Sequence, residues 1–214
     1  MKNLLVAQSG GPTSAINATL AGVVENALSS PSVDRIYGSI NGIQGVLTEN
    51  LIDLKTKITN VSELDLLCQT PASALGSCRV KLKDPAVCAD EYETIISVLR
   101  KYNIDCFIYI GGNDSMDTVD KLSKYLNTKG ITDITVVGAP KTIDNDLCGT
   151  DHCPGFGSAA KYIGTTFAEL ERDCYVYATK AVTIVEVMGR DAGWLTAASC
   201  LARANGAKGP DFIY

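Results

Sequence analysis

Two segments of the sequence share one order: a short apolar run, a pair of glycines and then a helical pattern. The first runs from Leu4–Ala7 through Gly10-Gly11, and the second from Cys106–Ile110 through Gly111-Gly112. Short apolar runs that end at glycine indicate buried strands, and apolar residues spaced three and four apart indicate a helix. The repeated strand–turn–helix order predicts an α/β fold built from Rossmann-like βαβ layers.

Other parts of the chain continue this alternation. Strands are predicted at 33–37, 134–137 and 181–187, and helices at 86–103, at 158–173 and through Trp194 and Leu201. The glycine-rich residues 38–45 are predicted to form a loop, and residues 47–60 give a mixed pattern.

The paired glycines suit an anion such as phosphate. A backbone without Cβ atoms can approach a ligand closely, and the N-terminus of the following helix offers free N–H groups and the positive end of its dipole. A plain tight turn would use the same residues, and Asn113 or Asp114 could equally be an ordinary N-cap. The residues alone leave both interpretations open.

A polar loop, Pro140–Leu147, follows the predicted strand at 134–137. Ligands of open α/β sheets bind at the carboxyl ends of the strands. Asp144 and Asp146 are two residues apart and therefore project to the same side of an extended segment, where one could accept a proton and the other could hold a cation. A turn whose Asx side chains satisfy their own backbone is the alternative.

Composition excludes several functions. The net charge of −5 in 214 residues gives no sign of binding to nucleic acid or to an anionic membrane. The eight cysteines are scattered and are expected to be reduced, and His152 is the only histidine. Cys148, His152 and Cys153 do not have the spacing of a structural zinc site. The absence of a signal-peptide pattern and of a membrane-length apolar run predicts a cytoplasmic protein.

Four motifs then occur in the order found in one family: Gly10-Gly11, Gly111–Ser115, Pro140–Asp146 and Met188–Gly193. With them, the chain resembles the phosphofructokinase family over nearly its whole length, and most of all the branch that uses pyrophosphate. The resemblance implies a glycolytic enzyme that transfers a phosphoryl group from pyrophosphate to the C1 hydroxyl of fructose 6-phosphate, giving fructose 1,6-bisphosphate. It also implies Mg²⁺ as cofactor, a homo-oligomer, a donor-binding lobe at 1–154 and the start of a sugar-phosphate lobe at 155–214.

The resemblance further implies a role for each matching residue. Asp144 corresponds to the catalytic base, Arg79 and Arg190 would stabilise charge on the transferred group, and Asp146 corresponds to a carboxylate of the Mg²⁺ site. The implied donor-binding residues are Gly11, Gly112, Asn113, Asp114, Ser115 and Lys141. The implied substrate-binding residues are Thr142, Asp144, Met188, Gly189 and Arg190.

Two positions bear on the choice of donor and metal. ATP-using relatives typically have glycine in place of Asp114, which leaves room for an α-phosphate; a carboxylate there would fill that space and repel a third phosphate. Lys141 is less telling, because some ATP-using relatives also have this lysine. Asn113 replaces an acidic residue that helps to hold Mg²⁺ in the family, and a neutral amide oxygen is a weaker ligand.

Other functions stay open at this point. An ATP-dependent 6-phosphofructokinase is the alternative within the family, and a non-catalytic phosphosugar-binding chain is another, although it need not have kept Asp144–Asp146. A different GG-loop kinase, acting on a dinucleotide or a lipid, is disfavoured by Met188–Arg190. Family members continue well beyond the position of Tyr214. The chain is therefore expected to be an N-terminal portion with an incomplete second lobe, of low stability and little activity by itself.

Overall fold

The structure, a computed structural model, describes residues 2–214. These residues form two compact units that divide after Lys141, so that unit 2 comprises Thr142–Tyr214. Each unit is described separately below. The lobe boundary expected between residues 154 and 155 stays a prediction.

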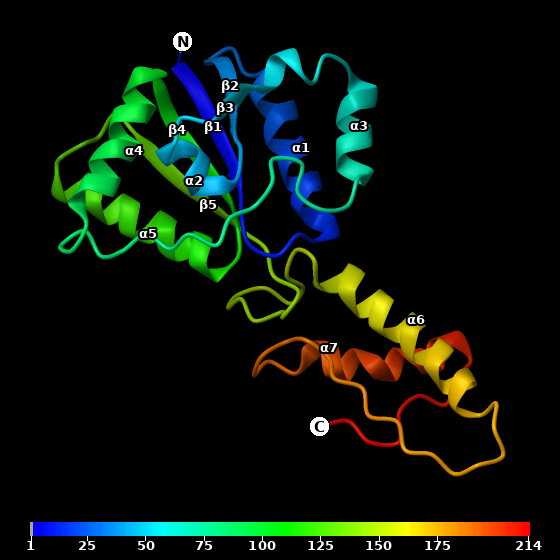
Figure 1. Ribbon diagram of the computed structural model, residues 1–214. Coiled ribbons are helices and arrows are strands. Elements are labelled where there is room, and N and C mark those ends of the chain that lie inside the picture. The colour runs from blue at the N-terminus through cyan, green and yellow to red at the C-terminus, as the bar shows by residue number, and fades with distance from the viewer. Residues whose placement is uncertain (1) are drawn as a thin grey trace. The chain divides into compact units, whose positions relative to one another are not determined.

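Unit 1 is built around a sheet of five strands (Figure 1). The strands are β1 (Lys2–Gln8), β2 (Val33–Ser39), β3 (Leu51–Asp53), β4 (Ile104–Gly111) and β5 (Thr135–Pro140). The helical elements of the same unit are α1 (Ser14–Ser29), α2 (Gly42–Leu47), the 3₁₀ turn η1 (Leu54–Thr56), α3 (Val61–Gln69), α4 (Ala89–Lys101) and α5 (Asn113–Thr128).

The order of strands in the sheet is β3-β2-β1-β4-β5, and all neighbours are parallel except β2 and β3. This arrangement confirms the predicted α/β fold. The chain leaves β1 in one direction, toward β2, and later continues from β4 in the other, toward β5. The direction therefore reverses between β1 and β4, and this kind of switch point is where open α/β sheets bind ligands at the carboxyl ends of their strands.

Helices cover both faces of the sheet (Figure 1). Leu5 and Ala7 of β1 face the core shared with α2, α4 and α5, whereas Leu4 and Val6 face the core shared with α1 and α3. Successive residues of a strand point to opposite faces, so a strand buried on both faces needs a continuous apolar run. That requirement explains why β1 and β4 could be predicted from the sequence.

Residues 38–45 do not form the predicted loop. Strand β2 continues to Ser39, and α2 begins at Gly42. Asn41 and Gly42 have φ values of 61° and 62°, a left-handed conformation that asparagine and glycine tolerate and that reverses the chain. The six-residue helix then buries Ile43 and Val46. So short a helix has too little periodicity to be predicted.

Unit 2 contains α6 (Phe156–Cys174), α7 (Trp194–Ala197) and the 3₁₀ helix η2 (Ala198–Asn205). Its small core includes Phe156, Ala160 and Leu195. A Cβ on Gly164 would lie 2.9 Å from the Cβ of Leu201, so α6 and η2 pack closely. The predicted helix at 158–173 is confirmed by α6, whereas the predicted helix through Leu201 changes to 3₁₀ geometry after Ala197.

The strand predicted at 181–187 is absent from the described part of unit 2. Val182 and Ile184 are each 90% exposed. A strand needs a neighbour to pair with its backbone N–H and C=O groups, and within residues 2–214 this segment has none. Apolar composition alone therefore could not make it a strand. Among the described helices, none is both long and apolar enough to cross a bilayer.

Candidate active site

The carboxyl ends of β1, β4 and β5 meet at one edge of the sheet in unit 1. The Ser9 N–H donates to the Ile110 carbonyl at 2.9 Å, and the Lys141 N–H donates to the Gly111 carbonyl at 2.9 Å. These two bonds extend the parallel ladder just beyond the strands. They bring together the Gly10-Gly11 turn, the Gly111-Gly112 turn and Lys141.

Gly10 lies where these three parts approach each other most closely. Its φ is 81°, and a Cβ at this position would lie 3.3 Å from the Gly112 nitrogen and 3.5 Å from Nζ of Lys141. The Lys141 residue is only 5% exposed. A cation and backbone nitrogens thus lie beside a turn without side chains, which is an arrangement that favours an anion.

The N-terminus of α5 belongs to the same edge of the sheet. Gly112 is the N-cap, and no side chain bonds to the cap. Asn113 and Asp114 are therefore the first helical residues and not N-caps, which excludes the ordinary-cap alternative. Both are exposed, while Ser115 is 3% exposed. The positive end of the helix dipole is left available to a ligand.

Hydrogen bonds hold the segment Ser77–Lys81 against the turn that contains Gly10. The Ser77 hydroxyl donates to the Gly10 carbonyl at 2.6 Å, and the Ser9 hydroxyl donates to the Cys78 carbonyl at 3.0 Å. Arg79 is exposed, and its guanidinium has no hydrogen bond or ion pair with another residue in the range 2–214. The segment thus presents a cation, Arg79, that is available to an anion.

A buried amide network holds the loop that leads to this segment. Gln8, which is fully buried, accepts hydrogen bonds from the Leu75 N–H at 2.9 Å and from the Ser73 hydroxyl at 3.0 Å. Asn17, 1% exposed, accepts from the Ala74 N–H at 2.8 Å. The sequence analysis missed both residues. The one available signal was a glutamine at the end of an apolar strand.

Two titratable groups lie behind the same segment. Burial raises the pKa of Tyr109 to about 12, and its hydroxyl accepts a hydrogen bond from the Ile43 N–H at 3.2 Å. Burial opposes ionisation of Cys78, but backbone hydrogen bonds from Val80 and Gln44 outweigh it and lower the pKa of this thiol. Tyr109 therefore stays neutral near pH 7 and serves as packing and as an acceptor.

Gly111 gives a prediction about the turn itself. A Cβ there would lie 2.5 Å from Cβ of Ser115 and 3.1 Å from the Ser9 carbonyl oxygen. Gly111→Ala is therefore expected to lower the free energy of unfolding by about 1–3 kcal/mol, as overpacking does. Urea denaturation measures the change. The matched control is Gly22→Ala in α1, where a Cβ meets nothing within 4 Å and alanine is expected to stabilise by up to about 1 kcal/mol. Equal stability of the two variants would contradict this account.

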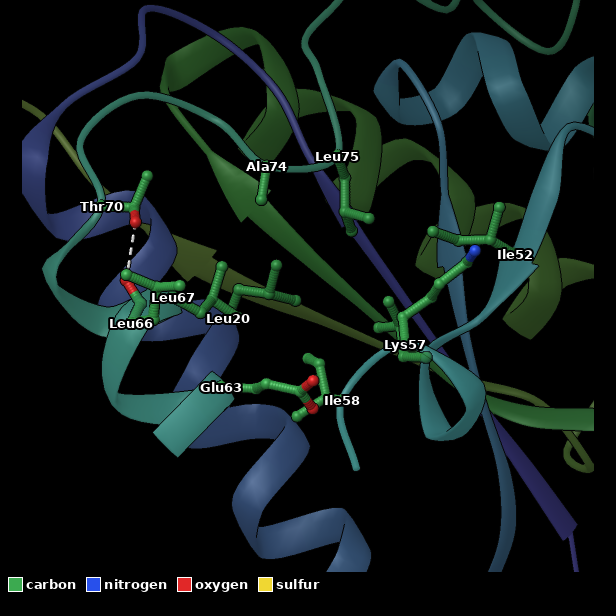
Figure 2. Close-up of a pocket in the computed structure, with 11 residues that line it drawn as sticks. Leu20, Ile52, Lys57, Ile58, Glu63, Leu66, Leu67, Thr70, Ala74 and Leu75 are labelled. Atoms are coloured by element: carbon green, nitrogen blue, oxygen red, sulfur yellow. Dashed lines mark hydrogen bonds between the residues drawn. The ribbon is translucent and has the colours of Figure 1, made fainter. Parts of the chain in front are cut away.

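Unit 1 also has an apolar pocket of about 350 Å³ (Figure 2). Aliphatic side chains of α1, β3 and α3 line it, including Leu20, Ile52 and Leu67. The hydrogen bond drawn in Figure 2 joins the Thr70 hydroxyl to the Leu66 carbonyl at 2.6 Å and thus serves the end of α3. None of the residues predicted to form the site lines this pocket.

In unit 2, the loop that carries Asp144 is held by its own polar groups. The Thr142 N–H donates to the Pro154 carbonyl at 3.1 Å, and the Asp144 N–H donates to the Thr142 hydroxyl at 3.0 Å. Asn145 donates to the Asp151 carbonyl and accepts from the Cys153 N–H, at 3.0 and 2.8 Å. Asn145 therefore closes the loop through bonds to residues six and eight positions further along the chain, and these are not the bonds of an Asx turn, which join a side chain to the backbone two residues on.

Asp144 and Arg190, both predicted to be catalytic, lie together in unit 2. Oδ2 of Asp144 lies 3.6 Å from Nε of Arg190, and the two side chains are 14% and 69% exposed. Arg190 has a φ of 52°, a strained conformation for a residue with a long side chain. It follows Gly189, whose φ is 143°. Met188, just before it, is 74% exposed.

Asp146 is exposed, and its carboxylate makes no hydrogen bond or ion pair with the other described residues. Within residues 2–214, no three His, Cys, Asp or Glu side chains are grouped so that they could hold a metal ion by themselves.

The sheet topology defines an α/β protein, and its glycine turns lie beside Lys141 in an arrangement that favours an anion. A model of the phosphofructokinase family matches residues 3–213. The chain belongs to the phosphofructokinase family.

Named relatives add detail. The chain is 46% identical over 211 residues to the pyrophosphate–fructose 6-phosphate 1-phosphotransferase of Xanthomonas campestris pv. campestris (strain B100), covering 98% of this chain and 48% of the relative. It is 34% identical over 206 residues to the ATP-dependent 6-phosphofructokinase of Actinobacillus pleuropneumoniae serotype 5b (strain L20), covering 94% and 57%.

The crystal structure of pyrophosphate-dependent phosphofructokinase from Nitrosospira multiformis aligns with a TM-score of 0.86 at 43% identity, covering 98% of this chain and 51% of that one. The chain thus spans about half the length of the pyrophosphate-dependent relatives that it matches.

Proposed function

We propose that the protein transfers a phosphoryl group from pyrophosphate to the C1 hydroxyl of fructose 6-phosphate. The observation that carries the proposal is the arrangement in unit 1 in which the Lys141 ammonium lies beside the Gly10 and Gly112 turns. Support also comes from the higher identity to pyrophosphate-dependent relatives, 43–46%, than to an ATP-dependent one, 34%.

Unit 1 is proposed to bind the donor. The Gly11 and Gly112 turns would accommodate the phosphate oxygens against backbone N–H groups, with Asn113, Ser115 and Lys141 as neighbours. Arg79, which is exposed on the hydrogen-bonded segment Ser77–Lys81, would contact the transferred group, because a guanidinium can bridge two phosphate oxygens. Asp114 would limit the site to a diphosphate without a nucleoside.

Unit 2 is proposed to supply the acceptor residues. Thr142 and the segment Met188–Arg190 would contact the sugar phosphate. Asp144 would accept the proton of the C1 hydroxyl. The ion pair with Arg190 supports this assignment, because it places the carboxylate beside the arginine that is proposed to contact the transferred group.

The reaction balances as a direct displacement. The C1 oxygen of fructose 6-phosphate forms a bond to the terminal phosphorus of pyrophosphate, and the bond from that phosphorus to the bridging oxygen breaks. The hydroxyl proton goes to Asp144, and orthophosphate leaves. Phosphoryl transfer of this kind depends on positioning and on stabilisation of charge, which the arginines and Lys141 would provide.

The residues present offer a few oxygen ligands that suit Mg²⁺. Mg²⁺ is commonly held by one or two carboxylates together with substrate phosphates and water. Asp146, exposed and without a protein partner among the described residues, is such a carboxylate in unit 2, and Asn113, in the proposed donor-binding set of unit 1, offers a neutral amide oxygen. When bound, the ion would neutralise charge on the phosphate oxygens.

A steady-state assay with fructose 6-phosphate and Mg²⁺, with pyrophosphate and ATP compared side by side, tests the proposal. We expect turnover with pyrophosphate and a kcat/KM for ATP at least about tenfold lower, which corresponds to about 1.4 kcal/mol in transition-state binding. Preference for ATP would overturn the donor assignment. Absence of turnover with either donor, in a folded protein that contains both lobes, would overturn the function.

A further inference from the structure

We infer that Lys81 belongs to the donor site and that its task is to neutralise Asp114, so that a highly charged diphosphate can bind next to a carboxylate. This inference rests on the proposed function, because it assigns Asp114 to the site of pyrophosphate. It adds a residue that determines donor affinity.

The geometry begins with the ion pair itself. Nζ of Lys81 lies 2.8 Å from Oδ1 of Asp114, and the two side chains are 64% and 63% exposed. Lys81 comes from the loop before α4, whereas Asp114 is in the first turn of α5. The pair therefore connects two parts of unit 1 that are distant in the sequence.

The backbone around Lys81 is fixed on both sides. The preceding Cys78 carbonyl accepts from the Ser9 hydroxyl at 3.0 Å. The following Leu82 is 1% exposed, and its carbonyl accepts from Nζ of Lys121 at 3.1 Å. These anchors direct the Lys81 side chain to the N-terminus of α5 and reduce the conformational entropy lost when its ammonium meets an anion.

The ion pair changes the charge at the N-terminus of α5, where pyrophosphate is proposed to bind. Asp114 lies at the positive end of the α5 dipole, next to Gly112 and Ser115, and its charge would repel pyrophosphate. Exposed ion pairs contribute little to folding stability, so stability does not account for a cation held at this place. The Lys81 ammonium, held against Asp114, offsets this negative charge at the place where pyrophosphate is proposed to bind.

The first test is calorimetric binding of pyrophosphate in the presence of Mg²⁺, using protein that contains both lobes. Lys81→Met is expected to weaken pyrophosphate binding about tenfold. This loss of affinity is at the lower end of the range for a hydrogen bond to a charged group, because the ion pair is exposed to solvent. Lys124→Met is the matched control: Lys124 pairs with Asp120 at 2.7 Å on the same helix α5 and is exposed. It should bind pyrophosphate as the parent does, and Lys81→Arg should restore most of the affinity.

The second test asks whether Lys81 acts through Asp114. In an Asp114→Asn background, Lys81→Met should weaken binding much less than in the parent, because the charge to be neutralised is gone. In kinetics, Lys81→Met should raise KM for pyrophosphate and leave KM for fructose 6-phosphate unchanged. Unchanged pyrophosphate affinity in Lys81→Met, or an equal loss in both backgrounds, would overturn the inference.

Binding and turnover separate this inference from the proposed function. If the parent protein binds pyrophosphate without transferring it and Lys81→Met weakens that binding, the inference holds and the function fails. If turnover with pyrophosphate is present and Lys81→Met changes neither KM nor affinity, the function holds and the inference fails. A parent protein that does not bind pyrophosphate would overturn both.

Discussion

Asp144→Asn is expected to lower kcat for phosphoryl transfer by about 10²–10⁴-fold, the usual contribution of a positioned general base. The amide has nearly the same shape as the carboxylate, so the hydrogen bond from the Asp144 N–H to Thr142 is retained. It cannot take the proton of the C1 hydroxyl. Steady-state kinetics with pyrophosphate as donor measure the loss, which should fall on kcat and leave KM for pyrophosphate unchanged.

The loss should not come from unfolding. The ion pair of Asp144 with Arg190 is open to solvent on the arginine side, and its removal is expected to cost about 1 kcal/mol or less. Asp151→Asn is the matched control, since Asp151 is an exposed carboxylate of the same loop that uses its backbone carbonyl to hold Asn145. Full turnover in Asp144→Asn, or the same loss in Asp151→Asn, would contradict the assignment of the base.

Asp114→Gly is expected to raise kcat/KM for ATP about tenfold to a hundredfold relative to pyrophosphate. Two unit charges about 4 Å apart repel by about 1–4 kcal/mol, depending on how much solvent screens them, and removal of the carboxylate also makes room for an α-phosphate. Measurement of kcat/KM with each donor, at one fixed concentration of fructose 6-phosphate, gives the ratio.

Asp114→Asn separates charge from size in that experiment. If repulsion dominates, the amide should recover most of the gain with ATP; if space dominates, only the glycine should. Either variant removes the negative charge that Lys81 neutralises. The affinity for pyrophosphate should therefore not fall in these variants for want of a neutralising cation. An unchanged preference for pyrophosphate in Asp114→Gly would show that Asp114 does not select the donor.

The elements that could be predicted from the sequence are those whose burial leaves a pattern. β1 and β4 are buried on both faces and are therefore continuous apolar runs, and the glycines that follow them are needed where the backbones of Gly10 and Gly112 approach each other. The order of these units also predicted which edge of the sheet would carry Lys141. In each case the local sequence and the tertiary structure favour the same conformation.

The features that were missed depend on contacts between distant residues. Lys81 reads as a surface lysine until α5 brings Asp114 to it, and Gln8 becomes informative only when the loop before Leu75 bonds to its side chain. The strand predicted at 181–187 was wrong for the opposite reason, because its local sequence is favourable and its tertiary contacts are missing. Its β-branched residues favour a strand, but strand formation requires a partner that residues 2–214 do not provide.

The measurement that tests the central claim most directly is ³¹P NMR of a mixture of pyrophosphate, fructose 6-phosphate, Mg²⁺ and the purified protein. The account predicts that pyrophosphate disappears while fructose 1,6-bisphosphate and orthophosphate appear in equal amounts, and that Asp144→Asn abolishes both signals. Conversion of pyrophosphate to orthophosphate without the bisphosphate, or formation of the bisphosphate only when ATP replaces pyrophosphate, would contradict it.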